Sequence, residues 1–142
     1  MRLVLDTAVM VAAIRSEFGA SRKLLVGALE EQFVLLVSTP LLLEYEAVMT
    51  RREHLDAAGI SAADVVALLD AIAIVARPVR LAFLWRPAVR DANDDMVLET
   101  AANGQAEGIV TFNRRDFGGV TDRFGIPVLL PGEALSRLEI EK

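Results

Sequence analysis

The sequence contains no cysteine and a single histidine, His54. Without cysteine the chain has no disulfide, no thiolate metal site and no cysteine nucleophile. One histidine excludes a zinc site built from several imidazoles, and a serine–histidine–aspartate triad would have to use His54. The 15 lysine and arginine residues are outnumbered by 20 aspartate and glutamate residues, which gives a formal net charge of −5. The chain could therefore contact nucleic acid only through a local basic patch or bound cations.

Glycine and proline are also scarce, at 9 and 5 residues of 142, and 54% of the residues are hydrophobic. This composition excludes disordered and low-complexity classes and predicts one globular domain over residues 1–142. The apolar N-terminal run is interrupted by Asp6, unlike a signal peptide. The apolar run at 65–76 contains Asp70 and is too short to span a bilayer. We expect a soluble cytoplasmic protein without a membrane segment.

Short apolar runs alternate with helical patterns along the chain. Strands are expected at 3–5, 33–37, 108–111 and 127–130, with a further strand at 74–75 or 79–81. Helices are expected at 9–14 and 20–31, with a break at 16–19, and then at 39–52, from 61, at 91–103 and from 131. The pattern predicts an α/β fold with three layers, α/β/α, and a mainly parallel central sheet of about four or five strands.

Several helix ends have recognisable local patterns. Ser38–Pro40 is a helix start, with a hydroxyl N-cap and an early proline. Ser61 and Asp64 have the spacing of a capping box, and the helix after them is expected to lie mainly in the core. Gly104 is expected to cap the end of the helix that precedes it.

Polar residues follow the expected strands where those strands end. Asp6 comes after the first strand, and Thr111, Asn113 and Asp116 come after the fourth. Glu44 lies in the second turn of the helix after the second strand, at the flank of its apolar face. The carboxyl ends of parallel strands meet at one edge of a sheet, where ligands bind. These oxygen-bearing side chains are therefore expected to converge.

The strongest local pattern is Asp91-Ala92-Asn93-Asp94-Asp95, at the start of an expected helix. An N-cap and the helix dipole explain some acidic residues there, but three carboxylates pushed together repel one another unless a cation joins them. Asp95 borders the apolar side of the helix and can point into a crevice. The pattern favours a metal role for the cluster.

Structural interpretations of the other site residues stay open. The alternative for Asp6 is capping of the helix that follows it, and for Glu44 it is a solvated position on the helix surface. Asn113 suits the turn after a strand, and Asp116 could cap a short helix beginning near Phe117.

Carboxylate and carbonyl oxygens without histidine or cysteine select hard cations such as Mg²⁺ or Mn²⁺, whose substrates are most often phosphates. Such a site hydrolyses phosphodiesters by lowering the pKa of a bound water and holding the attacking and leaving oxygens in line. It needs no histidine as general base, which suits a chain with one histidine.

Four short motifs occur in order along nearly the whole chain. They are Leu-Val-Leu-Asp-Thr-Ala at 3–8, Ser-Thr-Pro-Leu-Leu-Leu-Glu at 38–44, Asp-Ala-Asn-Asp-Asp-Met-Val-Leu-Glu-Thr-Ala at 91–101, and Val-Thr-Phe-Asn-Arg-Arg-Asp-Phe at 110–117. Together they resemble the PIN-domain ribonucleases, a family that includes the VapC-like toxins of bacterial toxin–antitoxin pairs. The resemblance implies a PIN-like fold and an endoribonuclease that hydrolyses RNA.

The resemblance also implies roles for individual residues and partners. The metal, Mg²⁺ or Mn²⁺, would be bound by Asp6, Glu44 and Asp95, with Asn113 or Asp116 completing the catalytic site. Accessory roles fall to Thr7, Asp91, Asp94 and Thr111. Candidates for a basic rim that contacts RNA are Arg22, Lys23, Arg114 and Arg115, together with Arg51 and Arg52. The family further implies a homodimer, and inhibition by an antitoxin protein that plugs the acidic pocket with a basic side chain.

The sequence departs from the family at two positions. Ala8 replaces the usual asparagine, which would orient the first carboxylate, and Asn113 stands where some members have aspartate. Two alternatives follow: a catalytically impaired PIN-like domain that acts as a binding module, and a DNA-cleaving nuclease of the same superfamily. A receiver domain would need a lysine after a late strand, but the lysines are Lys23 and Lys142. An aspartate-nucleophile phosphatase would need an aspartate at position 8, where this chain has alanine.

Overall fold

The structure, a computed structural model, describes residues 1–82, 92–119 and 123–141. Within these residues a five-stranded sheet has the order β3-β2-β1-β4-β5, and all neighbouring strands are parallel. The strands are β1 (Arg2–Leu5), β2 (Val34–Val37), β3 (Arg77–Pro78), β4 (Gly108–Val110) and β5 (Val128–Leu129). The predicted parallel sheet is confirmed, and β1 lies at its centre.

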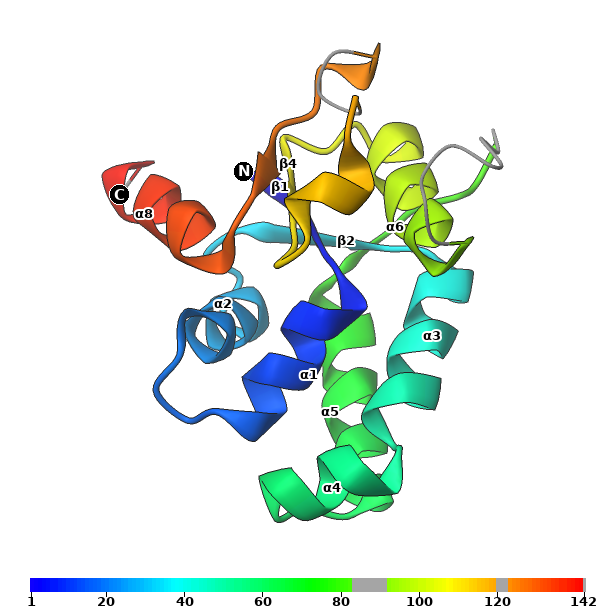
Figure 1. The fold of residues 1–142 in the computed structure, drawn as a ribbon, viewed down its shortest axis with the longest axis vertical. Coiled ribbons are helices and arrows are strands. Elements are labelled where there is room, and N and C mark those ends of the chain that lie inside the picture. Colours follow the sequence, from blue (N-terminus) through cyan, green and yellow to red (C-terminus); the bar gives the residue numbers. More distant parts are fainter. Residues whose placement is uncertain (83–91, 120–122, 142) are drawn as a thin grey trace.

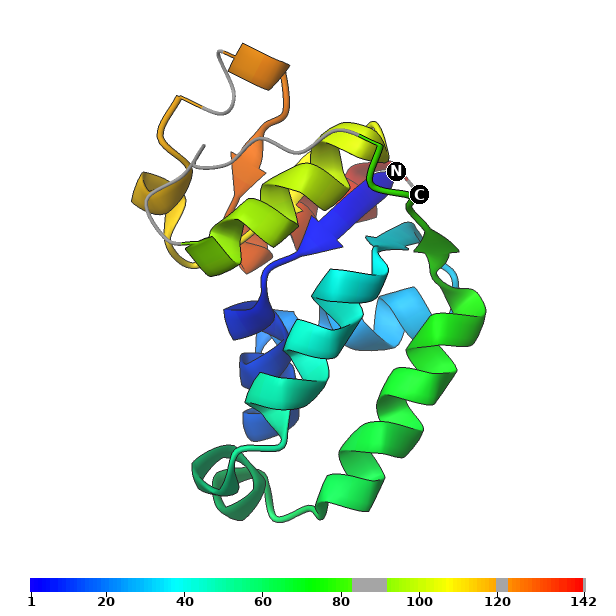
Figure 2. The same ribbon diagram turned by 90° about the vertical axis from the view of Figure 1, so that its right-hand side faces the viewer.

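Helices cover both faces of this sheet and complete the predicted α/β/α layers. They are α1 (Thr7–Arg15), α2 (Ala20–Leu29), α3 (Thr39–Met49), α4 (Arg52–Ala58), α5 (Ala62–Val75), α6 (Ala92–Asn103), the 3₁₀ helix η1 (Arg114–Phe117) and α8 (Pro131–Glu141). Figure 1 shows their arrangement. The chain passes from β1 to β2 to β3 in one direction and then returns across the sheet to β4 through α6. Right-handed crossovers therefore place α6 on the face opposite α3 and α5, as Figure 2 shows.

The centre of the sheet forms the core. Leu3, Val4 and Leu5 of β1 are completely buried. Helix α6 packs against β1, and the strands β2 and β4 lie on either side of it in the sheet. Burial of successive residues on both faces explains why this strand is apolar throughout instead of alternating. A rigid central strand fixes the position of the residue that follows it, Asp6.

The predicted helix starts are confirmed at α3 and α5. The Ser38 side chain accepts a hydrogen bond from the Leu41 amide, with Pro40 in the first turn. At α5, the Asp64 amide donates to Ser61 Oγ at 3.1 Å and the Ser61 amide donates to Asp64 Oδ2 at 2.9 Å. The hydrogen bonds from the backbone and then the side chain of Ser61 lower the pKa of Asp64. This is a complete capping box.

The predicted helix at 39–52 ends earlier, at Met49. The Thr50 hydroxyl donates to the Glu46 carbonyl at 2.6 Å, and Arg51 then takes an extended conformation. A side-chain hydrogen bond to the backbone competes with the regular helix ladder at this point. The short helix α4 follows and was not predicted; it begins at Arg52 and turns back toward α1.

The third strand and the end of α6 can also be compared with the prediction. The third strand lies at Arg77–Pro78, between the two expected positions, because α5 continues through Val75. Gly104 directly follows α6, as expected of its cap, and its amide donates to the Thr100 carbonyl at 2.9 Å; the left-handed residue is the next one, Gln105, with φ of 53°. Glycine is needed at position 104 for space, because a Cβ there would lie 2.8 Å from Val79 Cγ2.

Helix α5 is less buried than expected. Val65, Leu69 and Ile72 form its buried stripe, whereas Val66 and Ile74 are exposed. Among the described residues, no single helix is long and apolar enough to cross a membrane; α4 and α5 reach that length and composition only as a pair bent by 88°.

Candidate active site

Asp6 lies where the central strand ends, and its side chain is buried, with 7% of the residue exposed. Its amide donates to the Val110 carbonyl at 2.9 Å, which ties the end of β1 to the end of β4. Asp6 occupies the N-cap position of α1, but its side chain makes no capping hydrogen bond. The capping interpretation is therefore wrong. Instead, the Thr111 hydroxyl donates to Asp6 Oδ2 at 2.7 Å.

Thr111 connects Asp6 to the loop after β4. It is completely buried, and its Oγ1 accepts a hydrogen bond from the Asn113 amide at 3.1 Å. Because the amide can only donate, the hydroxyl proton of Thr111 is directed at the carboxylate of Asp6. This geometry suits the accessory role predicted for Thr111.

Tyr45 of α3 holds the end of β1 in place, and it was not predicted as a site residue. Its hydroxyl donates to the carbonyl of Leu5, the residue before Asp6, and the side chain is completely buried. Burial, and then the negative charge of Asp6, raise the pKa of Tyr45. A single tyrosine within the apolar stripe of a helix is the sequence feature that could have indicated a buried hydroxyl donor.

The predicted site residues from three distant segments line one pocket of about 330 Å³. Asp6 and Thr7 come from the end of β1 and the start of α1, Glu44 comes from α3, and Asn113 and Asp116 come from the loop and η1 after β4. We call this cavity the acidic pocket; Ala8, Val11, Val48, Arg51 and His54 complete its lining. Glu44 and Asp116 are half-buried, so the solvated interpretation of Glu44 is not supported. Asp116 lies inside η1, which begins at Arg114 and not near Phe117 as expected.

Asp95 is placed differently from the other predicted ligands. It is on α6, only 2% of it is exposed, and it is not among the residues that line the acidic pocket. Helix α6 packs against β1 and α3, the elements that carry Asp6 and Glu44. Asp94 belongs to α6, and Asp91 lies outside the described residues.

Arg51 and His54 bring positive and titratable groups to the acidic pocket. Arg15 Nη1 lies 3.2 Å from His54 Nδ1, and because a guanidinium only donates, Nδ1 accepts this hydrogen bond. Neutral His54 therefore carries its proton on Nε2. His54 was not predicted as a site residue, because its position depends on the unpredicted break between α3 and α4.

The residues predicted to form a basic rim lie on different elements and do not form one patch. Arg115 is exposed on η1, and Arg114 on the same helix pairs with Glu133 at 3.1 Å. The guanidinium of Arg22 instead donates to the carbonyls of Ala13 and Ile14 at the end of α1. Lys23 is exposed on α2, and the acidic pocket is not lined by Arg22 or Lys23. Of the arginines named from the sequence, Arg51 lies in the acidic pocket itself.

The donor set of the acidic pocket fits a hard cation. Asp6, Glu44, Asp116 and Asn113 offer carboxylate and amide oxygens, which Mg²⁺ and Mn²⁺ prefer. Among the described residues, no group of three or more acidic or histidine side chains is close enough to hold a metal ion as they stand. A cation here would therefore require the carboxylates to move toward one another, against a repulsion that the cation itself would remove.

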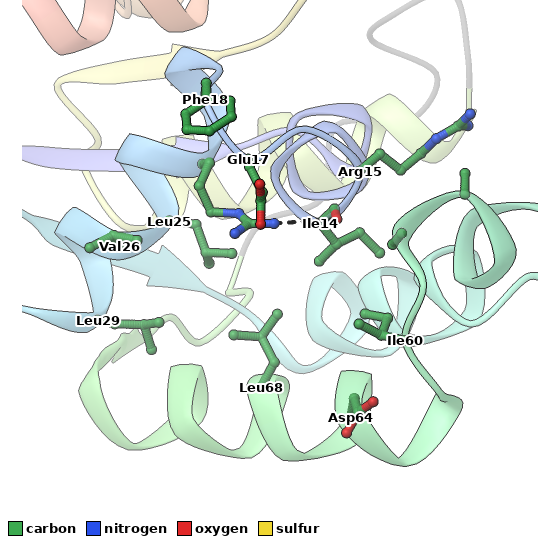
Figure 3. Close-up of a pocket in the computed structure, with 13 residues that line it drawn as sticks. Ile14, Arg15, Glu17, Phe18, Leu25, Val26, Leu29, Ile60, Asp64 and Leu68 are labelled. Atoms are coloured by element: carbon green, nitrogen blue, oxygen red, sulfur yellow. Dashed lines mark hydrogen bonds between the residues drawn. The ribbon is translucent and has the colours of Figure 1, made fainter.

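A larger cavity of about 790 Å³ lies at the C-terminal end of α1, where it is lined by residues of α2 and α5. Figure 3 shows Leu25, Val26 and Leu29 of α2 facing Leu68 of α5 across it. Its two acidic residues, Glu17 and Asp64, lie on opposite walls. This apolar groove has no cluster of oxygen donors, so the acidic pocket is the candidate active site.

Comparison with known proteins agrees with this arrangement. A family model described as PIN domain matches residues 2–115, which run from β1 into η1 and include Asp6, Glu44, Asp95 and Asn113. Asp116 follows the matched segment directly. No curated protein sequence matches the chain.

Proposed function

The chain belongs to the PIN domain family, whose members are generally nucleases that use divalent metals, and we propose that it is an Mg²⁺- or Mn²⁺-dependent endoribonuclease, the toxin of a toxin–antitoxin pair. The observation that carries the proposal is the acidic pocket. Three carboxylates and an amide from segments far apart in the sequence line it, beside the end of the central strand. Such an oxygen-only set at the carboxyl edge of a parallel sheet suits metal-assisted hydrolysis of a phosphodiester.

The carboxylates, Thr111 and Arg51 would have separate tasks in this reaction. Asp6, Glu44 and Asp116 would hold the cation, which when bound supplies a water of lowered pKa and stabilises charge on the phosphate. Thr111 fixes one oxygen of Asp6 by its hydrogen bond. Arg51 lines the same pocket and offers a positive charge to the phosphate that is cleaved.

Asp95 stays a proposed ligand on the strength of the resemblance. Asp95 is on α6, which packs against β1 and α3.

Removal of divalent metal is the first test. Cleavage of a labelled single-stranded RNA by the purified protein should fall to background in a chelator and return when Mg²⁺ or Mn²⁺ is added in excess. Calorimetric titration with Mn²⁺ should show binding by the same preparation. Cleavage that persists in the chelator would contradict the proposal, provided that a mock preparation without the protein is inactive, because a contaminating metal-independent ribonuclease is then excluded. A parallel assay with single-stranded DNA of the same sequence decides between RNA and DNA as the substrate.

The second candidate is a binding module with an impaired site. Ala8 favours it, because this residue lines the acidic pocket and replaces an amide that would orient Asp6. Metal binding without cleavage of either nucleic acid would support this candidate.

A homodimer is also proposed, on the basis of an apolar face on α3 and α5. Leu43 is 60% exposed, Ile74 is 83% exposed, and Leu43 and Val66 line one shallow hollow. Exposed apolar residues gathered on one face are typical of interfaces. We expect the protein to elute as a dimer in size-exclusion chromatography with light scattering and the Leu43→Glu variant as a monomer. The control is Phe18→Glu, which places the same charge at an exposed apolar position outside this face and should remain dimeric. A monomeric wild type would contradict the proposal.

The negative charge of the acidic pocket supports the proposal of an antitoxin partner. Carboxylates gathered from separate segments attract a lysine or arginine side chain of a partner protein. Occupation by such a side chain would exclude the cation and the RNA together.

A further inference from the structure

His54 lines the acidic pocket together with the carboxylates of the proposed site, and the proposed function gives it no task. It lies in the first turn of α4, where its amide donates to the Arg51 carbonyl at 3.0 Å. Because the two residues are three apart along this turn, their side chains leave it on the same side. The turn therefore brings a guanidinium and an imidazole to a pocket lined by carboxylates.

The partner of Nδ1 decides what the imidazole of His54 can bind. Arg15 Nη1 lies 3.2 Å from Nδ1. A guanidinium donates and never accepts, so Nδ1 is the acceptor and the proton of the neutral ring is on Nε2. A histidine that binds a metal has the opposite arrangement, because its second nitrogen donates a proton to a carboxylate, a carbonyl or water. The contact with Arg15 therefore makes Nε2 a hydrogen-bond donor and not a metal ligand.

The Nε2–H group of His54 has no acceptor in the part of the chain that the structure describes. Glu53 Oε1 lies 3.8 Å away, which is longer than a hydrogen bond, and the Glu53 side chain is 70% exposed. No enclosed side-chain nitrogen lacks a partner within the described residues, so Nε2 is open to solvent. An acceptor that a ligand brings can reach it.

The orientation of the ring is fixed from two helices. His54 belongs to α4, which packs against α1, and Arg15 lies in the last turn of α1. Figure 3 shows the Arg15 side chain directed away from Leu25 and Leu68 of the apolar groove. A donor that is already oriented binds a charged group in the substrate without the cost of rearrangement.

From this arrangement we propose that His54 donates its Nε2–H to a non-bridging oxygen of the phosphate that is cleaved, and that Arg15 is the positioning residue that keeps the proton on Nε2. The proposal rests on the proposed nuclease function and deepens it. Asp6, Glu44 and Asp116 carry three negative charges, one more than a divalent cation supplies. Donors that accompany the cation therefore help the pocket to hold a phosphate.

The first experiment observes the contact without cleavage. His54 is the only histidine, so its ring nitrogens give the only imidazole signals in a ¹⁵N NMR spectrum. The protein with Ca²⁺ is compared before and after addition of a short single-stranded RNA. The Nε2 signal should be that of a protonated nitrogen and should shift when the RNA is added, and Nδ1 should stay unprotonated. An Nε2 signal that does not move overturns the proposal.

The second experiment measures the contribution of His54 to cleavage. In His54→Ala, kcat/KM for RNA should fall about 10- to 100-fold, in line with the loss of one hydrogen bond to a charged group. Hydrolysis of bis(p-nitrophenyl) phosphate should fall by the same factor, because the contact is with the phosphate. His54→Gln keeps an N–H near the position of Nε2 and should recover most of the activity, whereas His54→Asn should not.

Two controls separate this contact from other effects of the substitution. Calorimetric binding of Mn²⁺ should be the same in the wild type and in His54→Ala, which a metal ligand or a collapsed pocket would not allow. Glu53→Gln removes the exposed carboxylate nearest to Nε2 and should change cleavage less than about twofold. Unchanged kcat/KM in His54→Ala, with an active wild type, overturns the proposal and leaves the nuclease intact. If the wild type cleaves nothing, the proposed function fails, and the NMR experiment alone judges the contact.

The role of Arg15 is tested by a double-mutant cycle. Arg15→Met removes the donor to Nδ1 and should lower kcat/KM several-fold, with the imidazole proton then shared between Nδ1 and Nε2 in the ¹⁵N spectrum. In the His54→Ala background the same substitution should cause no further loss, because Arg15 acts through the imidazole. Losses that simply multiply would show that Arg15 acts independently and would remove it as a positioning residue.

Discussion

Replacement of Asp6 by asparagine should abolish RNA cleavage, with a loss of at least about a hundredfold, while the protein stays folded. Asparagine keeps the shape of the side chain and an oxygen that can accept the hydrogen bond from Thr111. It removes the negative charge, and a neutral amide is a far weaker ligand for Mg²⁺ or Mn²⁺ than a carboxylate. The effect is therefore expected in metal binding and in turnover, and not in the circular dichroism spectrum.

Asp56→Asn provides the matched control for this variant. Asp56 is an exposed residue of α4 whose contact with Arg52 is at 3.9 Å, so the same chemical change there should leave cleavage and Mn²⁺ binding unaltered. Expression of the wild-type chain alone should arrest growth of bacterial cells if it is a toxin, and the Asp6→Asn chain should not. An Asp6→Asn protein that cleaves RNA at the wild-type rate would remove Asp6 from the mechanism.

The central part of this site could be predicted from the sequence because it depends on local rules. Asp6 follows an apolar strand directly, and the carboxyl end of a central parallel strand lies at the ligand edge whatever the details of packing. Asn113 and Asp116 follow from the same rule applied to β4. Glu44 depends on a helix start at Ser38, which the hydroxyl and the following proline fix locally.

Residues whose position depends on contacts between distant segments could not be predicted in the same way. Arg51 and His54 reach the acidic pocket because the chain leaves the helix at Thr50 and begins α4, which packs against α1. The side chain of Asp95 borders an apolar face by helical periodicity, but how deeply it is buried depends on the packing of α6 against β1 and α3. Helical spacing predicts in which direction a side chain points around its own helix. It does not predict which other elements will pack over that side chain.

Phe112 shows a different limit. In the motif at 110–117 it reads as a spacer between a threonine and an asparagine with predicted roles. In the structure Phe112 lines a cavity, which is enclosed by the junction of α1 and α2 and by the start of α8. Nothing in the sequence near Phe112 indicates that these segments meet there.

The largest pH effect on stability is expected from Tyr45. Its hydroxyl is buried and donates to the Leu5 carbonyl, and its pKa in the folded state is raised above the ordinary value of 10.0. Above pH 10 the unfolded chain releases the phenolic proton and the folded protein retains it, so the folded state binds more protons. The stabilisation is therefore present below pH 10 and is lost as the pH rises, by about 1.4 kcal/mol of unfolding free energy per pH unit.

Comparison with Tyr45→Phe isolates this effect from the titration of lysine and arginine, which both proteins share. At neutral pH the variant should be less stable by about 1–3 kcal/mol, because the Leu5 carbonyl loses its buried donor. Above pH 10 the difference in unfolding free energy between the wild type and Tyr45→Phe should shrink, since phenylalanine has no proton to lose in either state. Urea unfolding at a series of pH values measures the difference. Because the chain has a single tyrosine, phenolate absorbance follows the same group directly, and its appearance near pH 10 in a protein that is still folded would contradict the buried, hydrogen-bonded hydroxyl.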